Sequence, residues 1–148
     1  MVGLPDFIFN QRSLLVAWSK VHFSLISQAL WSTTWTTYRT IGGNVQMRIS
    51  DISLANGVQW QKANLVVSLL DSSGKEWGKT ATINKTWGAI TPYISLGKVD
   101  PKRLLKLRTV LNIYADTGWG GNWLPSGYWG TWDGDLRWDN EVSGGSID

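Results

Sequence analysis

Residues 103–114 read Arg-Leu-Leu-Lys-Leu-Arg-Thr-Val-Leu-Asn-Ile-Tyr, and their side chains alternate in character along the chain. Odd positions from 105 to 113 carry Leu, Leu, Thr, Leu and Ile, whereas even positions from 106 to 114 carry Lys, Arg, Val, Asn and Tyr. Successive side chains of a β-strand point to opposite faces, so a period of two is typical of a strand with one buried face. The stretch therefore predicts a strand that covers a hydrophobic core.

Three further segments have strand character. From Asn44 to Ser50, apolar residues alternate with polar ones, and Gly42-Gly43 before them predicts a turn. Branched aliphatic residues fill 64–70, a polar turn follows at 71–75, and 76–83 returns, which predicts a β-hairpin. A short strand is expected at 93–96, between Pro92 and Gly97.

The N-terminal third fits two structures. Positions 15, 18, 22, 25 and 29 have the three-four spacing of an amphipathic helix, whereas Val21, Phe23 and Leu25 alternate with polar residues as in a strand. Helix and strand both stay open for residues 13–31. We favour the strand, because the Thr- and Trp-rich continuation at 32–40 suits a pleated surface.

These patterns together predict an all-β fold. About seven to nine short strands, with turn signals between them, are typical of an antiparallel β-sandwich or a small barrel. The 148 residues suit a single β domain spanning 1–148, and the Gly- and Ser-rich residues 142–148 predict a flexible tail.

Composition narrows the chemistry. The chain has eleven tryptophans, one histidine and no cysteine, which excludes disulfides, thiolate chemistry and thiolate zinc sites. The formal net charge of +3 gives a mild attraction to acidic partners. The first thirty residues hold no apolar run long enough to span a membrane and no recognisable signal peptide. We nevertheless expect a secreted or cell-surface protein.

Tryptophan and glycine recur together in Trp-Gly dipeptides at 77–78, 87–88, 119–120 and 129–130. Residues 118–132 are the densest aromatic segment, and their glycine content predicts a long surface connection that presents rings. Indole and phenol faces stack on sugars, while nearby polar groups fix hydroxyl directions. The predicted contact residues are Trp119, Trp123, Tyr128, Trp129 and Trp132, with Asn122, Asp133 and Asp135 as hydrogen-bonding groups.

A second aromatic cluster comprises Trp31, Trp35 and Tyr38 among threonines. On a strand, Trp31 and Trp35 share one face, which is either a flat binding surface or the inner face of the sheet. The sequence leaves both interpretations open.

Candidate catalytic and metal-binding residues are few. His22 lies in an apolar, strand-like stretch, which favours a packed or surface histidine over a catalytic one. Asp133, Asp135 and Asp139 suggest calcium ligands or glycosidase carboxylates, but no glutamate closes a calcium loop and no second catalytic carboxylate can be placed. We therefore predict a solvated turn with a minor role in hydrogen-bonding a ligand, and no catalytic residue, metal site or cofactor.

The leading hypothesis is a non-enzymatic extracellular protein that binds carbohydrate or a cell-envelope glycan through its aromatic surface. One alternative is a membrane-active toxin or bacteriocin-like protein that inserts or assembles on anionic lipid through the same rings. A second is a structural subunit of a surface layer, fibre or phage particle, in which tryptophans are buried at subunit contacts and the protein forms homo-oligomers. The sequence speaks against nucleic acid, because the cations of 98–108 are separated from the tryptophan-rich segment and the net charge is low. No stretch matches a family motif well enough to assign a family.

Overall fold

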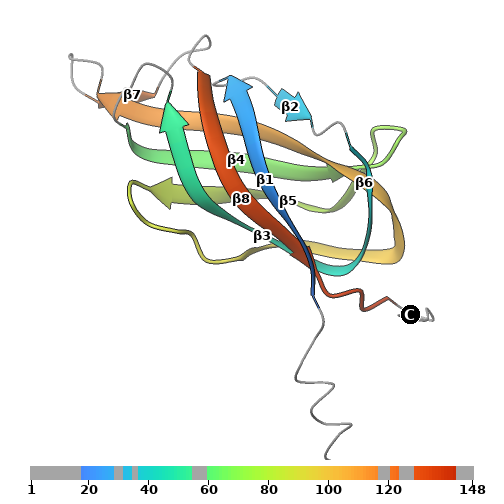
Figure 1. The fold of residues 1–148 in the computed structure, drawn as a ribbon. Coiled ribbons are helices and arrows are strands. Elements are labelled where there is room, and N and C mark those ends of the chain that lie inside the picture. Colours follow the sequence, from blue (N-terminus) through green and yellow to red (C-terminus); the bar gives the residue numbers. More distant parts are fainter. Residues whose placement is uncertain are drawn as a thin grey trace, which may run out of the picture.

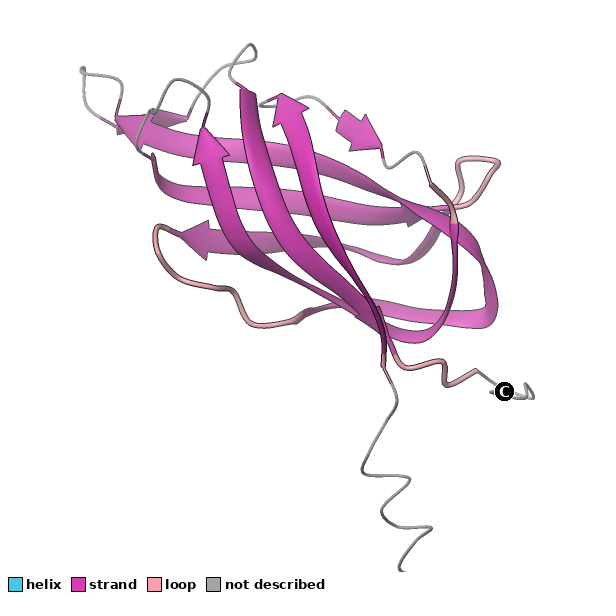
Figure 2. Cartoon of the chain, in the orientation of Figure 1, coloured by secondary structure: helices cyan, strands magenta, loops and turns pink. Residues whose placement is uncertain are grey.

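The structure is a computed structural model that describes residues 18–28, 32–34, 37–54, 60–116, 121–123 and 129–142. Its strands are β1 (Ser19–Gln28), β2 (Ser32–Thr34), β3 (Arg39–Leu54), β4 (Trp60–Leu70), β5 (Glu76–Thr86), β6 (Ile94–Asp116), β7 (Gly121–Trp123) and β8 (Trp129–Trp138). The described residues contain strands, turns and loops (Figure 2), and none of them forms a helix that could cross a membrane.

The strands form one antiparallel path in the order β1-β8-β3-β6-β4-β5, with β2 and β7 also paired to β6. The first part of β6 pairs with β3 and its second part pairs with β4, so this one strand joins the two halves of the path (Figure 1). The all-β, antiparallel prediction is confirmed. The sandwich or small barrel of seven to nine strands is not confirmed, because the six-strand path is open, with β1 and β5 at its ends.

A single hydrophobic core takes side chains from both halves of the path. On β6 the buried positions are the odd ones from 105 to 113, as the alternation of the sequence predicts. Phe23 of β1 and Trp132 of β8 pack against each other with ring centroids 6.3 Å apart, and Trp132 is fully buried. The core is therefore enclosed by the inward side chains of strands that lie far apart in the sequence.

The N-terminal ambiguity is resolved as a strand for residues 19–28, which pair with β8 in the register His22↔Asp135. The predicted hairpin is confirmed, since β4 and β5 pair across the turn at residues 71–75. The tail prediction lies almost entirely outside the described residues, which end at Val142.

Two local predictions are wrong. The strand expected at 93–96 is present from Ile94, but its expected end at Gly97 is wrong, because Gly97 at φ 80° lies within the 23-residue β6. Gly42-Gly43 is no turn but part of β3, where the pairing with β6 shifts register between Ile41 and Gly43. Gly43 has φ 87°, and a Cβ there would lie 2.2 Å from Asp139 Oδ1, so the bulge requires glycine.

Trp132→Ala should lower the free energy of unfolding by about 3–5 kcal/mol, because it removes a large side chain from a closed core. Trp87→Ala is the matched control, since 61% of Trp87 is exposed. Guanidinium titration of both variants measures the difference. A smaller loss for Trp132→Ala than for Trp87→Ala would contradict the placement of Trp132.

Candidate functional site

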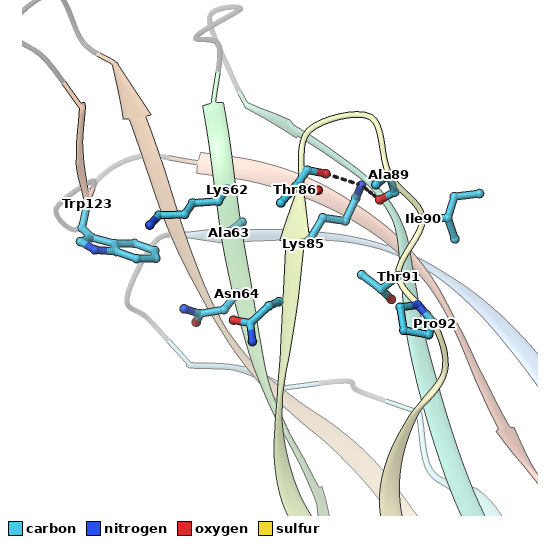
Figure 3. Close-up of a pocket in the computed structure, with 11 residues that line it drawn as sticks. Lys62, Ala63, Asn64, Lys85, Thr86, Ala89, Ile90, Thr91, Pro92 and Trp123 are labelled. Atoms are coloured by element: carbon cyan, nitrogen blue, oxygen red, sulfur yellow. Dashed lines mark hydrogen bonds between the residues drawn. The ribbon is translucent and has the colours of Figure 1, made fainter.

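Three large apolar side chains are exposed around one end of the molecule. Trp87 is 61% exposed, Ile90 63% and Trp123 48%. Ile90 and Trp123 line a hollow of about 390 Å³, and Trp87 lines an adjoining hollow of about 400 Å³ that shares Thr86 with the first. Figure 3 shows Trp123 and Lys62 on one side of the hollow that Ile90 and Trp123 line, and the segment from Ala89 to Pro92 on the other.

Strand β7 positions the Trp123 ring. Because β7 pairs with the end of β6, Trp123 lies opposite Tyr114, and the two rings meet edge to face with centroids 5.5 Å apart. The Lys62 ammonium lies 4.9 Å from the Tyr114 centroid and 5.7 Å from the Trp123 centroid. The end of the sheet therefore presents an indole with a cation beside it.

The segment after β5 is held in place by buried groups. Lys85 is only 2% exposed, and its Nζ donates hydrogen bonds to the carbonyl oxygens of Thr86 and Ala89. Burial lowers the pKa of Lys85, and the nearby Asp51 charge opposes that shift. Ile49 N donates to Thr91 Oγ1 at 2.8 Å, which ties the segment to β3.

Trp60 supports Trp87 from beneath. The Trp60 indole is buried and its Nε1 donates to the carbonyl oxygen of Ile52 at 2.9 Å. The Trp87 ring packs edge to face on it, with centroids 5.3 Å apart. Trp87 is thus held in an exposed position by a fixed neighbour.

Side-chain amides lie next to the rings. Asn84, Asn64 and Asn112 occupy one cross-strand row over β5, β4 and β6, and Asn112 Nδ2 donates to Asn64 Oδ1 at 2.7 Å. Asn64 and Asn84 line the hollow beside Trp123, together with Lys62 and Thr86. The site therefore combines flat rings with hydrogen-bond donors and acceptors.

The structure places the predicted aromatic residues in different settings. Trp123 is exposed at the hollow, and its role as a ligand contact stays a prediction. The prediction for Trp132 is wrong, because this side chain is fully buried beside Phe23 and cannot belong to a contact surface. Asn122 and Trp129 have backbone positions in β7 and β8, so the predicted long connection at 118–132 is wrong for residues 121–123 and 129–132. The contact residues Trp119 and Tyr128, and Trp31 and Trp35 of the second cluster, lie outside the described residues.

The remaining member of the second cluster, Tyr38, is half-buried. The Lys106 ammonium lies 5.3 Å from its ring centroid. Tyr38 is thus not brought to the hollow around Trp123.

The predicted solvated turn at Asp133 and Asp135 is wrong, because both residues belong to β8. Asp135 is buried at the centre of a cross-strand row, where its carboxylate accepts from His22 Nδ1 and from Arg48 Nε, each at 2.9 Å. Burial raises the pKa of Asp135, but the hydrogen bonds from His22 and Arg48 bring it below its usual value. The predicted ligand-binding role of Asp133 and Asp135 stays a prediction.

Asp139 follows β8 and is buried as well. Its carboxylate accepts hydrogen bonds from Asn44 N and Nδ2, both at 2.8 Å, and from Glu141 N at 3.0 Å. It therefore ties the chain after β8 to β3. Among the described residues, no cluster of three His, Asp or Glu side chains could hold a metal ion.

Sequence reasoning missed most of the residues at the hollow. The Trp87-Gly88 dipeptide was a usable signal, because it follows a predicted strand and precedes Pro92. For Asn64 and Asn84 no local signal exists, since only the register of β4 against β5 makes them neighbours.

Comparisons with known proteins give limited similarity. No family model matches the chain, and no curated protein matches its sequence. Among solved structures it is similar to the infectious bursal disease virus VP2 subviral particle, with 12% identity, a TM-score of 0.45 and coverage of 84% of this chain and 33% of that one. The Gx strain of the same virus gives 13% identity, a TM-score of 0.42 and coverage of 88% and 34%. The chain spans about a third of these proteins, and at these values the likeness assigns neither family nor function.

Asp135→Asn should reduce the free energy of unfolding by about 1–3 kcal/mol at neutral pH, because His22 and Arg48 lose their anionic acceptor. The folded-state pKa of Asp135 is lowered, so its contribution is present above the unfolded value near 4 and is lost as pH falls through the folded value. Denaturant titrations of both proteins at neutral pH and in acid should therefore show a difference in unfolding free energy that disappears in acid. Asp133→Asn is the control, expected to change stability by less than about 0.5 kcal/mol; an equal loss in both variants would contradict this assignment.

Proposed function

We propose that the protein is a non-enzymatic structural subunit that assembles with copies of itself. The observation that carries this proposal is the grouping of Trp87, Ile90 and Trp123 around adjoining hollows, which we call the aromatic end. Single exposed apolar residues are ordinary, but grouped ones mark interaction sites. Tryptophan is also enriched at the centres of protein interfaces.

The part of the aromatic end that carries Trp87 is held by hydrogen bonds and ring packing, which favours association. Lys85 and Thr91 hold the segment after β5 through buried hydrogen bonds, and Trp60 supports the Trp87 ring. A surface that is ordered before contact loses less conformational entropy on binding. The hollows beside the rings offer space for side chains of a second copy.

An assembly larger than a dimer needs a second contact, because a single isologous contact closes after two subunits. The open strand path supports such a contact. β1 and β5 end the path, and each presents one edge that pairs with no other described strand. Edges of this kind are templates for pairing with another chain.

Glycan binding is the second candidate, supported by a specific observation. Trp123 stands beside the amides of Asn64 and Asn84 and the ammonium of Lys62, around one hollow. Cavities of a few hundred Å³ that combine an aromatic ring with a few polar groups are suited to small ligands. A sugar here would occupy the surface that the subunit contact needs.

The double substitution Trp87→Ser and Ile90→Ser should weaken self-association by about thirtyfold or more, since the loss of even one central interface residue costs about 2 kcal/mol or more. Analytical ultracentrifugation over a concentration series measures it. Leu104→Ser is the matched control, because Leu104 is 54% exposed but lies outside the aromatic end. A protein that stays monomeric at every concentration, or an equal effect of Leu104→Ser, would overturn the proposal.

The two candidates are separated with Trp123→Ala. Glycan binding predicts that tryptophan fluorescence responds to an oligosaccharide panel. Trp123→Ala should then reduce the binding free energy, measured by titrating that response, by roughly 1–3 kcal/mol. Subunit assembly predicts no response to the panel. In that case Trp123→Ala should instead shift the sedimentation profile toward the monomer.

A further inference from the structure

The end of the molecule opposite the aromatic end carries cations that are held on aromatic rings. In Figure 1 the turn between β4 and β5 and the bend of β6 lie together on the side away from β7. Arg103 lies 3.4 Å from the Trp77 ring centroid, and the Lys75 ammonium lies 4.6 Å from it. Lys106 lies over the Tyr38 ring. We call this group, with Arg108, the cationic end.

Asp71 fixes the indole that carries two of these cations. Its Oδ2 accepts from Trp77 Nε1 at 2.9 Å, and its Oδ1 accepts from Ser73 N, Ser73 Oγ and Lys75 N. These hydrogen bonds hold the pKa of Asp71 well below its usual value. The carboxylate is therefore committed to the turn and to the ring.

A ring positions a cation without neutralising it, unlike a carboxylate. Among the described residues, Lys75, Arg103 and Lys106 form no ion pair. Arg108 does, since its Nη2 lies 2.7 Å from Glu76 Oε1. The carboxylates of Asp71 and Glu76 at this end are already engaged, with Trp77 and with Arg108.

The arrangement suits phosphate groups. A guanidinium that lies on an indole keeps N–H groups at its edge, in a fork that matches phosphate oxygens. Lys106 and Arg108 are two residues apart on β6, which puts them about 6–7 Å apart along the strand. Such spaced, oriented cations can follow a polymer that carries one phosphate per unit.

We propose that the cationic end binds the phosphate backbone of a single-stranded nucleic acid without sequence preference. The sequence argument against nucleic acid rested on the low net charge and on the separation between the cations of 98–108 and the tryptophan-rich segment, but the fold brings Arg103 to Trp77 and gathers cations at one end. A lipid surface is disfavoured, because Trp87, Ile90 and Trp123 lie at the opposite end and leave Leu104 as the exposed large apolar side chain of β6.

The test is fluorescence anisotropy of a labelled oligothymidine with the full chain. Three phosphate contacts to a single strand, one for each cation without an ion pair, predict a loss of affinity of roughly twentyfold between about 50 and 200 mM salt. Arg103→Gln with Lys106→Gln leaves one of these contacts, so the affinity falls and the loss over the same salt range shrinks to roughly threefold. Lys20→Gln with Arg137→Gln removes the same charge from the pair of β1 and β8, outside the cationic end, and should leave binding near the unmodified level.

A further variant separates positioned cations from net charge. Trp77→Leu keeps the charge but removes the ring under Arg103, and should weaken binding by about two- to fivefold. Circular dichroism confirms that this variant is folded, and the charge variants carry the test if it is not. Equal effects of the two charge pairs, no binding at low salt, or equal capture by phosphatidylserine-phosphatidylcholine vesicles would each overturn the proposal.

Discussion

The alternation of β6 is the constraint on which the structure depends. This strand runs for 23 residues and pairs with β3 along its first part and with β4 along its second. Its odd side chains from Leu105 to Ile113 are buried in the core that both halves of the path share. A shift of one residue would turn these side chains to solvent and expose the cations of the even positions to the core. Both the core and the outer polar rows therefore follow from one register.

Buried polar groups determine how the strand ends are held. The Asp139 carboxylate joins the chain after β8 to Asn44 of β3. The Lys85 ammonium, at the end of β5, donates to the carbonyl oxygens of Thr86 and Ala89 and so holds the segment that follows. Each group has its partners, because a buried donor or acceptor without one costs about 1–3 kcal/mol. The Trp87 ring is exposed on the segment that the Lys85 hydrogen bonds hold in place.

The sequence predicts the parts of the fold that depend on local periodicity. The hairpin at 64–83 and the buried face of 103–114 depend only on side-chain alternation and turn chemistry, and both are confirmed. The candidate site depends on register between distant strands, which no local pattern encodes. Asp135 looks like a turn residue beside Gly134, yet β1 and β3 pair on either side of it and place His22 and Arg48 against its carboxylate. The prediction that Trp132 lies on the surface failed for the same reason, because composition does not distinguish an exposed ring from a ring in the core.

The aromatic end exposes apolar rings to solvent, whereas the cationic end exposes charged groups. The proposals of self-association and of nucleic-acid binding are therefore compatible. At one end Trp87 and Trp123 are exposed on rigid supports, whereas at the other Trp77 is half-buried and covered by cations. Contact between aromatic ends removes apolar surface from water and leaves the cationic ends of both subunits facing outward. Self-association through the aromatic end and binding of a polyanion at the cationic end would therefore not compete for the same surface.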